Sequence, residues 1–297
     1  MNPPAPASPR AWLLAARPRT LPAAIAPVAV GTAIAYAAGG LKLGPALAAA
    51  VGSLLLQVAS NFANDVFDHE SGADDGRLGP PLAVHSGLLS ATAMRQGLGL
   101  ALAGAFAVGI YLVAVAGWPI VVLGVLAMIC AVAYTGGPYP LGYHGFGDVL
   151  VLIFFGFAAV CGTVFVQLGQ VPTVAWWAAV PVGTLATAIL VVNNLRDRQG
   201  DAMVGKKTLA VRLGPVGTRV EYTLLVAAAY AIPLAGAIHY RHAALILPAA
   251  SLPLAIPLVT QLWRRDGADL NPCLPATARL LLVFSLLWAG AILWAAS

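Results

Sequence analysis

Long apolar runs constrain the fold of this chain more than any other feature. Nine stretches approach or exceed the roughly 20 residues that a helix needs to cross a bilayer. They lie at residues 20–38, 45–66, 92–115, 118–136, 148–168, 173–195, 216–238, 243–263 and 277–296. Only 9% of the 297 residues are charged, against about 25% in a soluble domain. The sequence therefore predicts an all-α integral membrane protein with about nine transmembrane helices.

The domain organisation follows from the same runs. The beginning of the chain is rich in proline and alanine, and we predict a disordered tail over residues 1–16 and a single transmembrane domain over residues 17–297. An Arg-Leu-Gly tripeptide occurs twice, at residues 77–79 and 212–214. Each copy follows an acidic cluster, four runs apart, which predicts two similar four-helix halves plus one helix.

Basic residues predict the orientation in the membrane. If the N-terminus is cytoplasmic, fourteen of the sixteen Lys and Arg residues fall on the cytoplasmic side, and only Lys42 and Arg241 fall outside. This asymmetry follows the positive-inside rule. We expect a multi-pass protein of the cell (inner) membrane, with the N-terminus and the active site cytoplasmic and the C-terminus outside. Because the net charge of +5 sits beside membrane helices, membrane lipid is an expected partner and nucleic acid is not.

The first polar cluster lies at the end of the second apolar run. Its four members have the spacing i, i+3, i+4 and i+7, so they share one helix face. They are Asn61, Asn64, Asp65 and Asp68, and Asp74 and Arg77 follow them. Carboxylates are costly in membrane helices, and their presence there indicates a functional site.

A second polar cluster ends the sixth apolar run. Asn194, Asp197 and Asp201 share a helix face at i, i+3 and i+7, with Arg196 among them and Lys206 and Lys207 after them. Oxygen ligands of this kind suit Mg²⁺, which binds one or two carboxylates and completes its shell with substrate phosphates. The two clusters together predict a place where Mg²⁺ holds a diphosphate between the ends of the second and sixth helices.

A glycine-rich stretch, residues 134–148, joins the fourth and fifth runs and carries Tyr134, Tyr139 and Asp148. Such a stretch could close over the metal site. Aromatic faces can stabilise a carbocation by the same attraction that holds a cation over a ring. Interfacial tyrosines are also common membrane anchors, and both interpretations stay open.

At these residues the chain resembles the UbiA superfamily of intramembrane prenyltransferases. Residues 17–28, 134–148 and 193–214 are similar to longer phrases of the group that prenylates 1,4-dihydroxy-2-naphthoate in menaquinone biosynthesis. The resemblance extends from about residue 17 to 280. It implies a nine-helix bundle, Mg²⁺ as cofactor, and a polyprenyl diphosphate and an aromatic acceptor as substrates. The expected reaction releases diphosphate and CO₂ and yields demethylmenaquinol.

The resemblance also implies roles for individual residues. It implies metal binding by Asn64, Asp65, Asp68, Asp74, Asn194, Asp197 and Asp201, with Asp65, Asp68, Asp197 and Asp201 as the catalytic carboxylates. The expected diphosphate ligands are Arg77, Arg196, Lys206 and Lys207. Asn61, Tyr134, Tyr139 and Asp148 are expected to contact the substrate or stabilise its cation.

Three other functions are compatible with parts of the sequence. Leu82 and Ala202 stand where related sequences usually carry a basic residue, so a different aromatic acceptor, such as 4-hydroxybenzoate of the ubiquinone pathway, stays open. A cation transporter could also use intramembrane aspartates, but here every acidic residue lies toward one face. A lipid phosphotransferase of the CDP-alcohol type is disfavoured, because Asp75-Gly-Arg77 matches only part of its motif.

Overall fold

The computed structural model describes residues 7–73 and 78–297, and within these ranges it contains helices and no strand. The α-helices are α1 (Pro9–Ala16), α2 (Pro22–Ala37), α3 (Leu43–Glu70), α4 (Ala91–Ala116), α5 (Trp118–Ala133), α6 (Gly147–Val151), α7 (Ala159–Leu168), α8 (Thr173–Met203), α9 (Leu209–Tyr240), α10 (Leu252–Arg264) and α11 (Cys273–Ala296). The other helical turns are the 3₁₀ segments η1 (Leu141–His144), η3 (Ala243–Ser251) and η4 (Gly267–Leu270), and the π-helix η2 (Leu152–Ala158).

The helix count agrees with the sequence prediction. In the described part of the chain, seven helical segments are long and apolar enough to cross a membrane, and the shorter apolar helices α2 and α5 occupy the two remaining predicted positions. Three of the seven are composite, because α6, η2 and α7 run on as one segment, as do η3 with α10 and η4 with α11. An all-α architecture with about nine membrane helices is confirmed.

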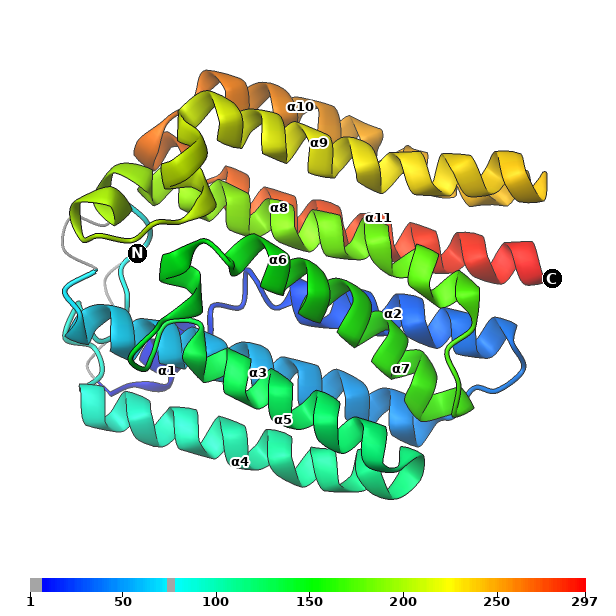
Figure 1. Ribbon diagram of the computed structural model, residues 1–297, viewed down its shortest axis with the longest axis horizontal. Helices are drawn as coiled ribbons and strands as arrows, with labels where there is room; N and C mark the ends of the chain where they lie inside the picture. Colours follow the sequence, from blue (N-terminus) through cyan, green and yellow to red (C-terminus); the bar gives the residue numbers. More distant parts are fainter. Residues whose placement is uncertain (1–6, 74–77) are drawn as a thin grey trace.

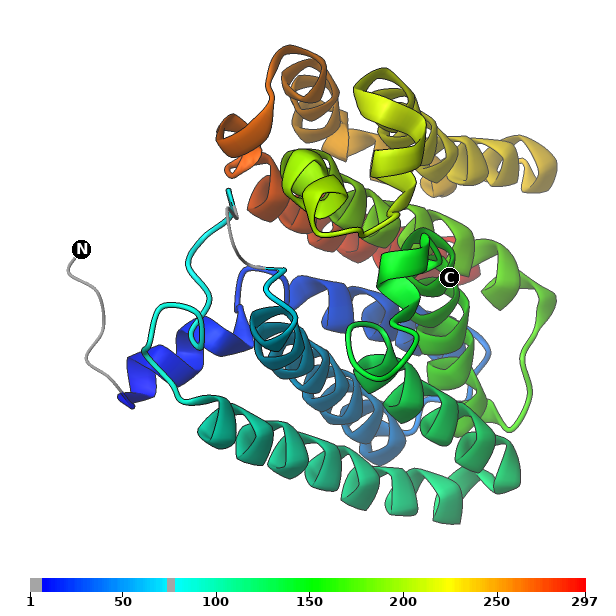
Figure 2. The same cartoon turned by 60° about the vertical axis from the view of Figure 1, so that its left-hand side comes forward.

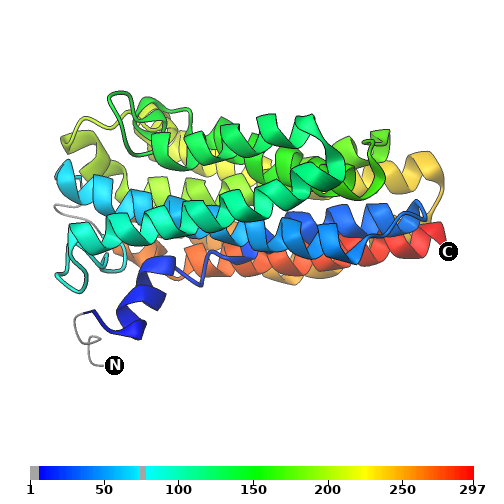
Figure 3. The same ribbon diagram turned by 90° about the horizontal axis from the view of Figure 1, so that it is seen from below.

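The long helices lie side by side along one axis (Figures 1 and 3). In Figure 1, α3, α4 and α5 form one side of the bundle, α8 to α11 form the other, and α2 and α7 lie between them. The largest packing interfaces join α3 to α4 and α8 to α9. Each helix that carries a polar cluster thus packs on the helix that follows it, as two similar halves would.

Helix α8 is the most enclosed of the long helices. Within its most apolar window 72% of the residues are buried, against 17% in α3. Close approach to the π-helix η2 depends on two glycines, because a Cβ built on Gly156 would lie only 2.8 Å from the Cα of Gly183. Small residues allow such contacts between membrane helices. Burial of α8 means that its polar residues must find partners inside the protein.

The predicted disordered tail is wrong for residues 9–16, which form α1. Ser8 caps this helix by accepting a hydrogen bond from the Ala11 amide, and a proline stands at its start, where the missing N–H costs nothing. Ala11 and Ala15 are buried, and the Trp12 ring packs edge-on against Phe62 of α3 at 5.7 Å. These contacts order a segment whose composition suggested disorder. Figure 3 shows α1 lying obliquely at one end of the bundle.

Several connections gather at that end of the molecule. In Figure 1 they are residues 78–90 before α4, the glycine-rich segment between α5 and α6, and the short link between α8 and α9. Lys42, before α3, and Arg241, after α9, lie at the other end. The two basic residues that the sequence assigned to the outside thus lie together at the end opposite the connections.

Candidate active site

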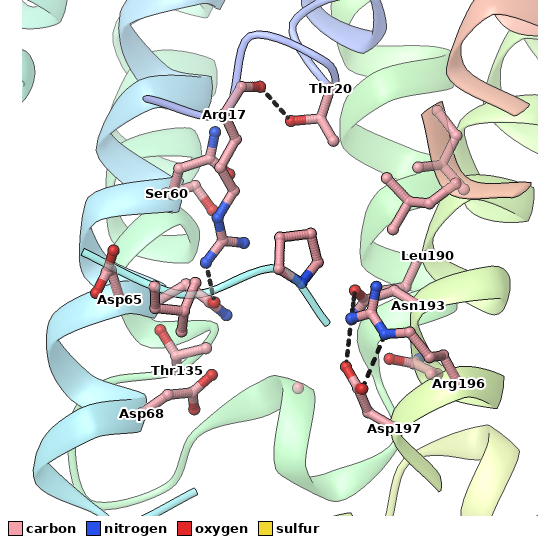
Figure 4. Close-up of a pocket in the computed structure, with 18 of the residues that line it drawn as sticks. Arg17, Thr20, Ser60, Asp65, Asp68, Thr135, Leu190, Asn193, Arg196 and Asp197 are labelled. Atoms are coloured by element: carbon pink, nitrogen blue, oxygen red, sulfur yellow. Dashed lines mark hydrogen bonds and ion pairs between the residues drawn. The ribbon is translucent and has the colours of Figure 1, made fainter. Parts of the chain in front are cut away.

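A cavity of about 1580 Å³ opens among the helix ends where these connections meet. It is lined from α3 on one side and from α8 on the other, so the two polar clusters converge as predicted (Figure 4). The predicted site residues that line it are Asn61, Asn64, Asp65, Asp68, Tyr134, Asn194, Arg196, Asp197, Asp201 and Lys206. Asp74 and Arg77 lie outside the described residues.

Lys206 joins the two clusters. Its ammonium lies 3.0 Å from Oδ1 of Asp68 on α3 and 3.9 Å from Oδ1 of Asp201 on α8. The same ammonium sits over the Tyr143 ring, 4.4 Å from its centroid. Carboxylates from both clusters therefore face one shared positive charge, and they do so with at most 12% of either side chain exposed.

Asp197 is neutralised from within its own helix. The guanidinium of Arg196 donates from Nε to Oδ1 at 2.9 Å and from Nη2 to Oδ2 at 2.5 Å. Arg196 also donates to Asn193 at 2.7 Å and to Asn271 at 3.2 Å, and only 1% of its side chain is exposed. This two-pronged ion pair, visible in Figure 4, holds the Asp197 carboxylate in place at the cavity wall.

Asp65 and Asp68 lie on the same helix but have different partners. Both oxygens of Asp65 accept backbone amides, from Ala83 at Oδ2 and from Val84 at Oδ1, each at 3.0 Å. Asp68 instead accepts the Tyr143 hydroxyl at 2.5 Å and the Lys206 ammonium. Figure 4 shows the two carboxylates pointing in different directions from α3, with Asp68 turned toward the α8 side.

The two asparagines of the first cluster bind the segment that joins α1 to α2. Asn64 accepts a hydrogen bond from Nη2 of Arg17 at 2.8 Å, and Asn61 donates to the Ala16 carbonyl at 2.9 Å. Arg17 caps α1 in a left-handed conformation with φ at 51°. Non-glycine residues adopt this conformation at a cost. The hydrogen bond to Asn64 holds the Arg17 side chain at the cavity (Figure 4).

The glycine-rich segment contributes differently from what we predicted. Tyr134 lines the cavity. The segment packs so closely around it that a Cβ built on Gly147 would lie only 2.7 Å from the Tyr134 hydroxyl. Tyr139 is half exposed, outside the cavity, and stacks on His144 at 3.5 Å. Asp148 is buried at the start of α6, behind the cavity wall, and its Oδ2 has no hydrogen-bond partner.

The residues that line the cavity differ from the predicted set at other positions too. Lys207 is exposed and does not line the cavity; its backbone amide donates to the Tyr143 carbonyl at 2.7 Å. Tyr143 and Asn271 line the cavity but were not predicted as site residues. Tyr143 stands in the same glycine-rich segment as Tyr134, which was the available signal, whereas nothing in the local sequence marks Asn271.

The donor set fits a hard cation that shares its ligands with a phosphate. Among the residues that the structure describes, no three acidic, histidine or cysteine side chains form a ready-made metal site. At the meeting point of the two polar clusters, where the ends of α3 and α8 line the cavity, the donors are carboxylate and amide oxygens. They come from Asn64, Asp68, Asn194, Asp197 and Asp201. Lys206 shows that Asp68 and Asp201 can face one positive charge, and Mg²⁺ usually keeps room for water and substrate oxygens.

Fold and site together define a helical membrane protein with paired acidic motifs that meet over one cavity. The comparison with family models is specific: residues 24–286 match the UbiA prenyltransferase family. The chain belongs to this family.

Relatives with curated names cover nearly the whole chain. A 1,4-dihydroxy-2-naphthoate octaprenyltransferase of Mycobacterium tuberculosis is 39% identical and matches 95% of this chain and 96% of its own. One of Haemophilus influenzae with the same name is 36% identical and matches 95% of each chain. The resemblance noted in the sequence is therefore confirmed, both for the family and for the group of 1,4-dihydroxy-2-naphthoate prenyltransferases within it.

Solved structures of low identity share the fold. A UbiA homolog from Archaeoglobus fulgidus, bound to GPP and Mg²⁺, aligns with a TM-score of 0.66 at 16% identity, over 96% of this chain and 99% of that one. The apo structure of a UbiA homolog from Aeropyrum pernix K1 aligns with a TM-score of 0.66 at 17% identity, over 88% and 95%. The agreement extends over the whole helical bundle.

Proposed function

We propose that this protein transfers a polyprenyl group from a polyprenyl diphosphate to 1,4-dihydroxy-2-naphthoate, with loss of diphosphate and CO₂. A carbon–carbon bond forms at the ring carbon that bears the carboxylate, and the bond to that carboxylate breaks. The product is demethylmenaquinol, an intermediate of menaquinone biosynthesis. The observation that carries the proposal is the shared charge of Lys206 between Asp68 and Asp201, together with the named relatives.

The meeting point of the two motifs is the proposed diphosphate site. Asp68, Asp197 and Asp201 supply carboxylates that would hold Mg²⁺, and Asn64 and Asn194 supply amide oxygens beside them. When bound, Mg²⁺ offsets the repulsion between carboxylates and diphosphate and stabilises the charge that develops on the leaving group. Lys206 adds a cation of the chain itself at the same place and would bind a diphosphate oxygen.

A second, apolar cavity offers room for the prenyl tail. It measures about 440 Å³ and is lined from α2, α3, α4, α5 and the η2–α7 segment. Five residues line both this cavity and the polar one: Gln57, Ser60, Tyr134, Val151 and Phe155. A diphosphate held at Lys206 could therefore extend its tail past Tyr134 and Phe155 into apolar surroundings.

The ring of Tyr134 stands at this boundary, where an allylic cation would form after the diphosphate leaves. An aromatic face near the cation stabilises it electrostatically, and the apolar walls exclude water that would otherwise capture it. Arg17 and Leu82 also line the polar cavity, whose volume of about 1580 Å³ leaves space for an aromatic acceptor beside the tail.

The direct test is an acceptor assay with the purified protein. Incubation with Mg²⁺, a polyprenyl diphosphate and either 1,4-dihydroxy-2-naphthoate or 4-hydroxybenzoate, followed by mass analysis, should yield a decarboxylated prenyl product from the naphthoate. Transfer to 4-hydroxybenzoate alone would refute the proposed acceptor and favour the ubiquinone-type alternative. Absence of transfer to either, with the protein folded, would refute the prenyltransferase proposal.

The proposal includes the orientation inferred from the basic residues. It places the cavity and the N-terminus on the cytoplasmic face of the inner membrane and the C-terminus outside. Labelling of single cysteines from either side of sealed vesicles would test this, because a residue after α9, such as Arg241→Cys, should react only from outside.

A further inference from the structure

Residues 78–90, between α3 and α4, form an irregular segment across the cavity, here called the strap. Figure 2 shows it, in cyan, running from the α11 side of the bundle to α1 and the start of α4. The strap residues that line the cavity are Leu78, Pro80, Pro81, Leu82, Ala83, Ser86 and Leu88. The strap thus forms part of the cavity wall.

The middle of the strap is held by Asp65. The two amides that bind its carboxylate, from Ala83 and Val84, leave neither oxygen without a partner, and the Asp65 residue is fully buried. The strap residues around these amides form a compact turn, in which the amides of Leu88 and Leu89 both donate to the Ala83 carbonyl. Hydrogen bonds to a charged group are the strong ones, so Asp65 is a firm anchor.

Asn271, between η4 and α11, holds the Leu78 end. Its Nδ2 donates to the Leu78 carbonyl at 2.9 Å, while its Oδ1 accepts from Nη1 of Arg196 at 3.2 Å. Arg196 in turn pairs with Asp197 of the second motif. The strap is therefore tied in its middle to the first motif and at its Leu78 end, through the side chains of Asn271 and Arg196, to the second.

We propose that Asp65 is a positioning residue that anchors the strap, rather than a metal ligand, and that the strap forms the wall against which the aromatic acceptor packs. Both carboxylates of the first cluster were expected to bind metal. The structure separates them: Asp68 faces Lys206 and the second motif, whereas Asp65 faces backbone N–H groups. Leu82 is 5% exposed and lines the cavity, so the strap presents apolar surface suited to an aromatic ring. The role of the strap in acceptor binding rests on the proposed prenyl transfer. The anchoring of the strap by Asp65 does not depend on that proposal.

The test compares Asp65→Asn with Asp68→Asn, a matched change three residues along the same helix. Asn keeps the shape of Asp but turns one acceptor into an NH₂ donor, which would face a backbone N–H. In Asp65→Asn we expect hydrogen exchange at Ala83 and Val84 to rise about tenfold or more. The KM for the acceptor should rise about tenfold, and the half-saturating Mg²⁺ concentration should change less than about twofold. In Asp68→Asn that Mg²⁺ concentration should rise about tenfold or more, with exchange at Ala83 and Val84 unchanged.

Two outcomes would overturn the inference. A raised Mg²⁺ requirement in Asp65→Asn, with protected Ala83 and Val84 amides, would make Asp65 a ligand. Faster exchange with an unchanged acceptor KM would remove the strap from the acceptor site. Should Asp65→Asn not fold, Asn271→Leu carries the test, with the same rise in acceptor KM and the same constant Mg²⁺ requirement. Because the exchange measurement needs no substrate, a failure of the proposed function would be recognised separately, by lack of transfer in the unaltered protein.

Discussion

The two acidic motifs have similar residues, yet they obtain their partners in different ways. Helix α8 is buried over most of its length, and Asp197 is neutralised by its own neighbour, Arg196. Helix α3 is far less enclosed, and its carboxylates take their partners from distant segments: the strap, Tyr143 and Lys206. The second motif is thus largely self-contained, whereas the first becomes a site only when other parts of the chain fold against it.

The largest effects should come from the carboxylates that face the meeting point. Asp68→Asn and Asp197→Asn should each lower Mg²⁺-dependent turnover about a hundredfold or more, because stabilisation of the leaving group by a metal contributes several kcal/mol. Turnover of purified variants, compared at equal amounts of folded protein, gives the measurement. Activity like that of the unaltered protein in either variant would remove that residue from the site.

Arg196→Gln tests whether the second motif is self-contained. Removing one partner of a buried ion pair leaves an uncompensated charge, so the variant should lose about 3 kcal/mol of stability. Thermal or denaturant unfolding of the detergent-solubilised protein would measure this loss. The neighbouring Arg198→Gln, which removes a cation that does not line the cavity, is the control and should unfold close to the unaltered protein.

Lys206→Gln tests whether the first motif depends on a cation from the opposite half. Loss of the ammonium should raise the KM for the polyprenyl diphosphate and reduce turnover, together about ten- to a hundredfold. Lys207→Gln is a matched control, since Lys207 is exposed and lies outside the cavity. Equal losses in both variants would mean that net charge, and not the position of Lys206, matters.

A smaller effect is expected for Tyr143→Phe. The change removes one hydrogen bond to the Asp68 carboxylate but keeps the ring beneath Lys206, so turnover should fall about tenfold or less. Tyr139→Phe, in the same glycine-rich segment but outside the cavity, should change turnover less than about twofold. If the two variants behaved alike, the geometry at Asp68 would not govern the rate.

Helical periodicity was sufficient to predict much of this site. The spacing of Asn64 and Asp68, and of Asn194, Asp197 and Asp201, places each set on one face, and the structure brings both faces to one cavity. The apolar runs predicted the helices that carry them, and the real helices extend further, to Glu70 and Met203. These features depend on local sequence, which is why the sequence could reveal them.

Contacts between distant segments could not be predicted in this way. Asp65 shares the predicted face with Asp68, but amides 18 and 19 residues away bind its carboxylate. Tyr143 reaches Asp68 across 75 residues and Asn271 reaches Arg196 across 75. Tyr139 and Asp148 belonged to a suggestive segment, yet its tight turns direct them away from the cavity. Which member of a patterned set faces the cavity is decided by tertiary packing.

A double-mutant cycle on Asp68 and Asp201 tests most directly whether the tips of α3 and α8 act as one unit. Residues that serve one site are strongly non-additive. The rate of Mg²⁺-dependent transfer in the Asp68→Asn, Asp201→Asn double variant should therefore be close to that of the slower single variant. A double variant slowed by the product of the two single effects would show two independent residues, and would contradict a shared site between the helices.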